Sequence, residues 1–274
     1  MRKICLLALV ALTACEKEID FDYHEVDPIV VIEGRVTNEG MEVVLTKSRS
    51  VNDSVPAAGL DGARVVVATD DETVELSFDE ATGTYRSPQT AVPGKTYRLT
   101  VDFEGTRYTA TSVMQEPSLI LNTEFTWQKV LDDQLLAYQV TATDPDSLQR
   151  NYFWYRLDRQ SSRPDLADVD LSKPYRWNVF DDRGNPPGLI LRDIMCMSKR
   201  IADENKKDDR KSILYEGDTL VLQWMTIDAA AFDYFRSLNS GQNSGANPRT
   251  NIAGGCLGYF LAGYVTRTAP VVFR

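Results

Sequence analysis

Hydrophobic and polar residues alternate with a period of two along the first half of the chain, between Pro28 and Met114. Because successive side chains of a strand point to opposite faces of a sheet, this alternation predicts strands with one buried face. Glu104-Gly105, between two such runs, predicts a tight hairpin. The predicted strands fall within residues 28–36, 42–45, 63–68, 74–78, 97–103 and 108–110. Short strands separated by turns are typical of a β-sandwich, so we expect an immunoglobulin-like or transthyretin-like domain over residues 28–115.

The second half continues the β pattern after a proline-containing joint at Gln115–Ser118. One helix is predicted after Asp228, which can cap its first turn, and Phe232 and Phe235 then recur on one face. The charged segment Lys199–Lys211 is interpreted as a solvated excursion. Further strands are predicted at 119–127, 134–143, 151–157, 175–180 and 219–227. We therefore expect a mostly β chain of two consecutive β-sandwich domains, the second over residues 118–274 with one or two short helices.

The first fifteen residues have the pattern of a bacterial lipoprotein signal. Arg2 and Lys3 precede an apolar run of nine residues, Ile4–Leu12, which is too short to cross a bilayer, where a helix needs about 20. Leu12-Thr13-Ala14-Cys15 matches a lipobox, so residues 1–14 are predicted to be removed and Cys15 to carry lipid. Residues 15–27, which are polar and acidic after the cysteine, then form a lipidated tether. The alternative is an ordinary secretory signal with a chance cysteine.

This pattern predicts a location and a membrane partner. Several acyl chains, palmitate among them, would anchor Cys15 firmly in lipid, whereas one chain binds only weakly. We expect an outer-membrane lipoprotein that faces the cell exterior.

Composition excludes several classes of function. The chain has 40 acidic and 30 basic residues, a net charge of −10, which disfavours nucleic acid as a partner. Its one histidine, His24, removes most nucleophile–histidine catalysis. No catalytic constellation, metal site or cofactor motif can be named, so we expect a protein that is not an enzyme and has no cofactor. Acidic clusters at 70–72, 144–147 and 181–185 are interpreted as turns, with a weak calcium site as the alternative.

Two pairs of residues are candidates for structural and binding roles. Cys196 and Cys256 remain after removal of the signal and lipidation of Cys15, and an oxidising compartment predicts one disulfide between them. The alternative is two buried free thiols. Tyr175 and Trp177 lie in a polar context and are candidates for a ligand-stacking platform, with core packing as the alternative.

The chain resembles the Bacteroidota lipoproteins called domain of unknown function 4249. The resemblance begins at Cys15-Glu16-Lys17-Glu18-Ile19-Asp20 and continues through the strands at 31–37 and 62–67 and the helix at 232–238. Its most specific part is a closing signature formed by Asn247, Pro248, Asn251, Gly254, Gly255, Gly258 and Phe260. Cys256 within the glycine run and the charged segment 199–211 depart from the pattern. The first half is also similar to carboxypeptidase-regulatory and transthyretin-like sandwiches.

The resemblance implies a cellular location and a partner, because such lipoproteins often accompany TonB-dependent outer-membrane transporters. It implies no reaction, because no catalytic residues are established for them. The favoured hypothesis is an accessory binding subunit of a TonB-dependent nutrient transporter. The alternative is a structural or adhesive lipoprotein of the cell envelope. A carboxylate-dependent hydrolase ranks last, because the sequence singles out no pair of acids.

Overall fold

The computed structural model describes residues 27–49, 57–130, 133–196, 207–241 and 246–274. Cys15 and almost all of the predicted signal and tether therefore lie outside the described residues. The strands are β1 Val30–Thr37, β2 Gly40–Lys47, β3 Arg64–Ala68, β4 Thr73–Asp79, β5 Thr84–Ser87, β6 Thr96–Phe103, β7 Thr106–Val113, β8 Ile120–Val130, β9 Asp133–Thr143, β10 Tyr152–Gln160, β11 Arg176–Asp181, β12 Leu189–Cys196, β13 Thr219–Ile227, β14 Leu257–Arg267 and β15 Val271–Val272. The helices are η1 Pro164–Leu166, α1 Lys207–Ser212 and α2 Ala229–Gly241.

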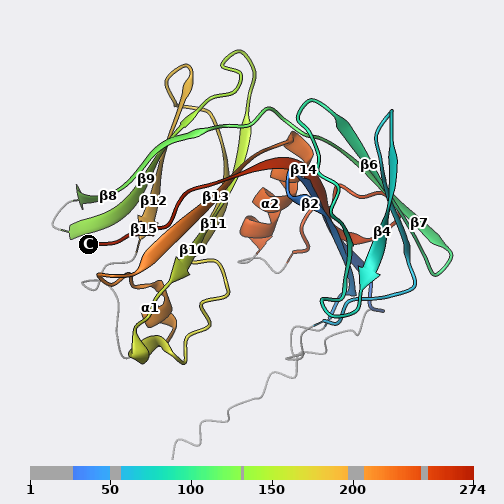
Figure 1. The fold of residues 1–274 in the computed structure, drawn as a ribbon, viewed down its shortest axis with the longest axis horizontal. Helices are drawn as coiled ribbons and strands as arrows, with labels where there is room; N and C mark the ends of the chain where they lie inside the picture. The colour runs from blue at the N-terminus through green and yellow to red at the C-terminus, as the bar shows by residue number, and fades with distance from the viewer. Residues whose placement is uncertain (1–26, 50–56, 131–132, 197–206, 242–245) are drawn as a thin grey trace, which may run out of the picture.

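One large sheet runs through both halves of the molecule. Its strand order is β11-β10-β13-β14-β1-β2-β5-β4-β3-β6-β7, with β15 on β13, and a separate sheet has the order β12-β9-β8. β14 joins the halves, because it pairs antiparallel with β13 and parallel with β1. Figure 1 shows the two lobes that result, with α2 beneath β14 between them. The predicted mostly β, sandwich-type fold is confirmed.

The first lobe closes around its core because β7 returns to β14. Thr109 forms a bridge with Ala253 just before β14, and the Ala262 backbone N–H donates to Ser112 Oγ over 2.8 Å. Phe260 and Ala262 of β14 pack in the same core as Ile32 and Leu99 of the first half. The chain leaves this lobe close to the predicted joint, yet it returns through β14. The division into domains 28–115 and 118–274 stays a prediction.

The second lobe is a sandwich of the three-stranded sheet against β10, β11 and β13. Its core contains Tyr138 and Ile194 from one sheet and Phe153 and Trp224 from the other. Each sheet of this sandwich has one buried face. Along most of β12, for example, buried and exposed residues alternate.

The hairpin and the helix cap that the sequence predicts are both present in the structure. Glu104 and Gly105 have φ values of 48° and 78°, which are the positive values that a two-residue hairpin between β6 and β7 requires. Asp228 Oδ1 accepts a hydrogen bond of 2.8 Å from the Ala231 backbone N–H at the start of α2. The acidic clusters also form turns, since Asp144 Oδ1 accepts from the Asp146 backbone N–H over 3.3 Å.

The described part of segment 199–211, interpreted from the sequence as a solvated excursion, forms α1, where Asp209 and Arg210 are partly buried and Lys211 is exposed. Arg159 Nη1 donates to the backbone carbonyl of Lys211 over 3.0 Å, and Arg159 is itself buried beneath the helix. A cation donating to the last carbonyls of a helix satisfies groups that have no partner within the helix. α1 is therefore fastened to β10.

The predicted disulfide between Cys196 and Cys256 is wrong, and the alternative of two buried free thiols describes the structure. Cys196 packs in the core of the second lobe, whereas Cys256 packs in that of the first. A disulfide needs Cα atoms about 5.5 Å apart, so a shared oxidising compartment does not suffice. Burial raises the pKa of each thiol to about 11.

Both thiols are expected to resist alkylation in the native protein. The thiolate is the reactive form, and both its low population and the surrounding core hinder reaction at pH 8. Peptide mapping after iodoacetamide treatment should therefore show Cys196 and Cys256 unmodified without denaturant, and both modified in urea without reductant. A peptide pair linked by a disulfide would contradict this.

Candidate functional site

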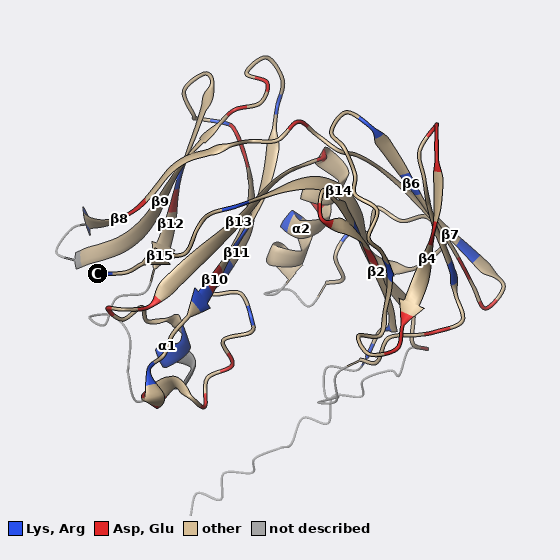
Figure 2. Cartoon of the chain, in the orientation of Figure 1, with Lys and Arg blue, Asp and Glu red and all other residues tan. Residues whose placement is uncertain are grey.

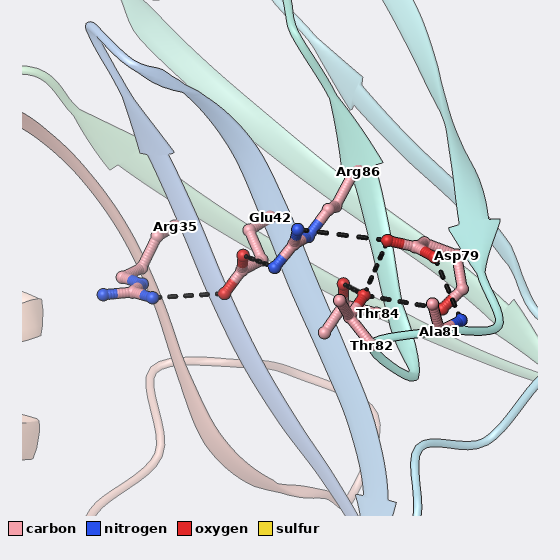
Figure 3. Close-up of polar contacts among 7 residues, drawn as sticks. All are labelled: Arg35, Glu42, Asp79, Ala81, Thr82, Thr84 and Arg86. Atoms are coloured by element: carbon pink, nitrogen blue, oxygen red, sulfur yellow. Dashed lines mark hydrogen bonds and ion pairs between the residues drawn. The ribbon is translucent and has the colours of Figure 1, made fainter. Parts of the chain in front are cut away.

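A ladder of opposite charges crosses three neighbouring strands of the large sheet. Arg35 on β1 lies opposite Glu42 on β2, and Glu42 lies opposite Arg86 on β5. Residues directly opposite one another share a face of the sheet, so the three side chains stand in one row. Arg35 Nη2 donates to Glu42 Oε1 over 3.1 Å, and Arg86 Nη2 donates to Glu42 Oε2 over 2.8 Å. One carboxylate thus holds two guanidinium groups (Figure 3).

The row ends at Asp79, at the end of β4. Its Oδ2 lies 3.9 Å from Arg86 Nη1 and accepts a hydrogen bond of 2.9 Å from Thr82 Oγ1. Its Oδ1 accepts from the Ala81 backbone N–H over 3.0 Å. The hydrogen bond from Thr82 above all, and then that from Ala81, lowers the pKa of Asp79. The turn therefore holds an ionised carboxylate beside Arg86 and fixes this end of the row.

The charge ladder borders a cavity of about 500 Å³. Gln223 of β13 and Arg267 of β14 also line it, so the cavity draws on strands from both lobes. Arg267 forms an ion pair with Glu39, and Arg267 Nη2 donates to Gln223 Oε1 over 3.4 Å. The parallel pairing of β1 with β14 is what brings Arg35 and Arg267 to one cavity.

Helix α2 covers the same face of the sheet beside the cavity. Met225 and Val265 line the cavity and also belong to the hydrophobic cluster under α2, together with Phe232 and Tyr259. The N-terminus of α2 is held in place because Asp228 Oδ2 accepts a hydrogen bond of 2.5 Å from Ser112 Oγ on β7. The apolar part of the cavity wall is therefore continuous with a packed core, and we expect it to be rigid.

Arginines outnumber acids among the residues that line the cavity, although the chain carries a net charge of −10. Three arginines and two glutamates line it, whereas basic and acidic residues elsewhere are spread over both lobes (Figure 2). Partial burial, and then the positive charge of Arg35, lower the pKa of Arg267. Two guanidinium groups that repel each other across a cavity favour an anion between them. Among the described residues, no group of three His, Cys, Asp or Glu is placed to hold a metal ion.

Tyr175 and Trp177, the predicted ligand platform, do not form one exposed surface. Tyr175 is buried, and its hydroxyl donates to the backbone carbonyl of Ser212 over 2.8 Å. It lines a second, smaller cavity of about 280 Å³. Trp177 packs edge-on against Phe235 of α2, with ring centroids 6.1 Å apart. The two rings serve different cores, as the core-packing alternative expects.

The closing signature holds the segment that leads into β14. The Asn251 side chain acts like a strand partner, because its Nδ2 donates to the Phe260 carbonyl over 2.7 Å and its Oδ1 accepts from the Phe260 backbone N–H over 2.9 Å. Gly254 and Gly258 have φ values of 116° and 104° and lie directly against neighbouring backbone. Asn247 is exposed and Pro248 and Gly255 lie at the surface of the same segment. None of the signature residues lines the cavity, and Asn251, Gly254 and Gly258 instead fix how the chain enters β14.

The sequence does not single out the cavity arginines, because 30 basic residues are scattered along the chain and none stands out. The alternation of hydrophobic and polar residues does give a partial indication of the charge ladder. Arg35 and Glu42 occupy the solvent-facing positions of two adjacent predicted strands, and a short hairpin would place them opposite each other. Nothing in the sequence brings Arg267 to the same place.

These features define a mostly β protein with a polar, arginine-lined cavity where its two lobes meet. The chain belongs to the family described as domain of unknown function (DUF4249), whose model matches residues 16–269. The resemblance in the sequence is thereby confirmed at the level of the family. A comparison with curated proteins finds no match. No helix in the described parts of the chain has both the length and the apolar character needed to cross a bilayer.

Proposed function

We propose that this protein is an outer-membrane lipoprotein, anchored through Cys15, that serves a TonB-dependent nutrient transporter as an accessory binding subunit. The observation that carries the binding role is the cavity of about 500 Å³ lined by Arg35, Arg86 and Arg267. Its size falls within the roughly 300–1,000 Å³ typical of small-molecule sites. Its arginines and Glu42 come from strands of one sheet, which place binding groups more accurately than loops do.

Two further features support this proposal. The ion pairs of the cavity acids favour binding over catalysis, and the N-terminal sequence favours a membrane anchor. Glu39 and Glu42, the acids of the cavity, are each in an ion pair with an arginine. This commits both carboxylates to holding cations, which suits binding rather than acid–base chemistry. The lipobox-like Leu12-Thr13-Ala14-Cys15 supports the anchor, and the acidic residues after it support export to the surface.

The test is a mild-detergent pull-down of the tagged protein from outer membranes, with the retained proteins identified by mass spectrometry. We expect a β-barrel transporter in a stoichiometric amount. The Cys15→Ala variant is the control, and we expect it in the soluble fraction without a transporter because its anchor is lost. A lone protein in the eluate would overturn the transporter partnership, and membrane retention of the variant would overturn the anchor.

One observation favours the structural or adhesive alternative. Leucines are exposed at one end of the outer face of the three-stranded sheet, where Leu191 is 52% exposed and Leu119 is 53% exposed. Leu189 and Leu191 flank the buried Ile190 on β12, so both point away from the core. Exposed apolar groups of this kind are typical of protein contacts. Recovery of an envelope protein other than a transporter in the same pull-down would favour this alternative.

A further inference from the structure

Three arginines reach the cavity from three different strands of the sheet, Arg35 from β1, Arg86 from β5 and Arg267 from β14. Their side chains are 41%, 47% and 41% exposed, so each retains a solvent-facing part that a ligand could contact. A guanidinium group presents parallel N–H donors that match the two oxygens of a carboxylate or phosphate. The wall therefore presents several groups suited to an oxyanion.

These arginines have donors to spare. Within the described part of the chain, Arg35 donates a hydrogen bond only to Glu42, through Nη2. A guanidinium group has five N–H donors, so one bond leaves most of them available to a ligand. Glu42 is also shared with Arg86, whose second ion pair is with Asp79. An anion that enters the cavity would therefore meet N–H donors that the ladder does not use.

The rest of the cavity limits the size and character of such an anion. Met225 and Val265 form an apolar part of the lining beside Arg267. The net charge of −10 disfavours large polyanions, which the whole surface repels, whereas a small anion contacts mainly the arginines that line the cavity. A small organic anion with a compact apolar part fits both conditions.

We infer that the cavity binds a small organic molecule through a carboxylate or phosphate group held between Arg35 and Arg267, with its apolar part against Met225 and Val265. The inference rests on the proposed function, because it names the class of ligand that the accessory subunit captures. Glu42 competes with the ligand for Arg35 and Arg86. Glu42 therefore opposes the ligand through its negative charge, while the ligand uses the N–H donors that Glu42 leaves unused.

The test measures binding of citrate and of inorganic phosphate to the full mature chain in mild detergent, by thermal shift and titration calorimetry. We expect at least one of them to raise the melting temperature at millimolar concentration, with an affinity that falls as salt is added. Arg35→Ala and Arg267→Ala should each weaken binding about tenfold or more, since each removes charge-assisted hydrogen bonds. Arg64→Ala is the matched control, because Arg64 pairs with Glu75 on the surface and does not line the cavity.

A variant that is expected to strengthen binding separates a role in binding from a role in folding. Glu42→Gln removes the competing negative charge while keeping the side-chain shape, so affinity for citrate or phosphate should rise on the order of fivefold. A purely structural role for the ladder would instead lower both stability and binding. Arg35→Lys, which keeps the charge but loses the planar fork, should bind more weakly than the native protein.

The outcomes distinguish this inference from the proposed function. The inference is overturned if neither anion binds, or if Arg267→Ala and Arg64→Ala bind equally well. Binding of a neutral sugar such as maltose, without either anion, would also overturn it while leaving the accessory binding role intact. The transporter partnership stands or falls separately, on the pull-down. Preference between citrate and phosphate decides which oxyanion the site takes.

Discussion

Replacement of Gly258 by alanine is expected to abolish cooperative folding. Gly258 lies opposite Ile32 in the parallel pairing of β14 with β1, and a Cβ atom there would lie 1.9 Å from the Ile32 carbonyl oxygen. Its φ of 104° is also unfavourable for any residue with a side chain. Backbone strain and a clash with backbone together should cost more than about 4 kcal/mol, a large part of the stability of a typical domain. The measurement is urea unfolding followed by tryptophan fluorescence.

The matched control for this variant is Gly255→Ala, three residues earlier in the same segment. Gly255 also has a positive φ, of 84°, but a Cβ atom there would have no neighbour within 4 Å. This variant should therefore lose only the free energy that a positive φ costs a residue with a side chain, about 1–2 kcal/mol, and should still unfold cooperatively. Equal loss in the two variants would show that the close approach of β14 to β1 does not govern folding.

Removal of Arg159 alone is expected to be strongly destabilising. Arg159 and Asp218 form an ion pair of 2.7 Å in which both side chains are only 1% exposed. Asp218 Oδ2 also accepts from the Tyr215 backbone N–H over 2.9 Å, so the pair connects β10, the turn before β13 and α1. Arg159→Met would leave an uncompensated buried carboxylate, which typically costs about 3–5 kcal/mol. Urea unfolding should show this loss.

Two companion variants make the interpretation specific. The double variant Arg159→Met/Asp218→Leu should recover part of the loss, because replacing a whole buried ion pair by apolar residues is often close to neutral. Arg163→Ala breaks a surface ion pair with Asp165 nearby and should cost no more than about 1 kcal/mol. A double variant less stable than Arg159→Met would contradict this account of the buried pair.

Local structure was largely predictable, because local patterns determine it. Alternation placed most strands, and Glu104-Gly105 and Asp228 identified a hairpin and a helix start correctly. The strands that were not predicted include β5, β12 and β14, and the causes differ. β14 is buried on both faces along most of its length, so it shows no alternation. β5 has only four residues, too few for alternation to register. β12 reads Leu-Ile-Leu-Arg-Asp-Ile-Met-Cys, in which apolar residues also occupy exposed positions, so the period of two is obscured.

The site was not predictable, because it depends on pairings between distant residues. β14 inserts between β13 and β1, and no local pattern near residue 257 specifies β1 as its parallel partner. Without that pairing, Arg267 has no reason to lie near Arg35. The same limitation explains the cysteines: the predicted oxidising compartment would allow a disulfide, but the topology sends Cys196 and Cys256 into different cores.

The most direct test of the account is native mass spectrometry of the full protein, purified in mild detergent from the cells that produce it. We predict a bound small molecule that is released on unfolding and carries a carboxylate or phosphate. It should be absent from an Arg35→Ala/Arg267→Ala double variant that still unfolds cooperatively. An empty native protein, or the same bound molecule in the double variant, would contradict the central claim that the arginine-lined cavity is the ligand site.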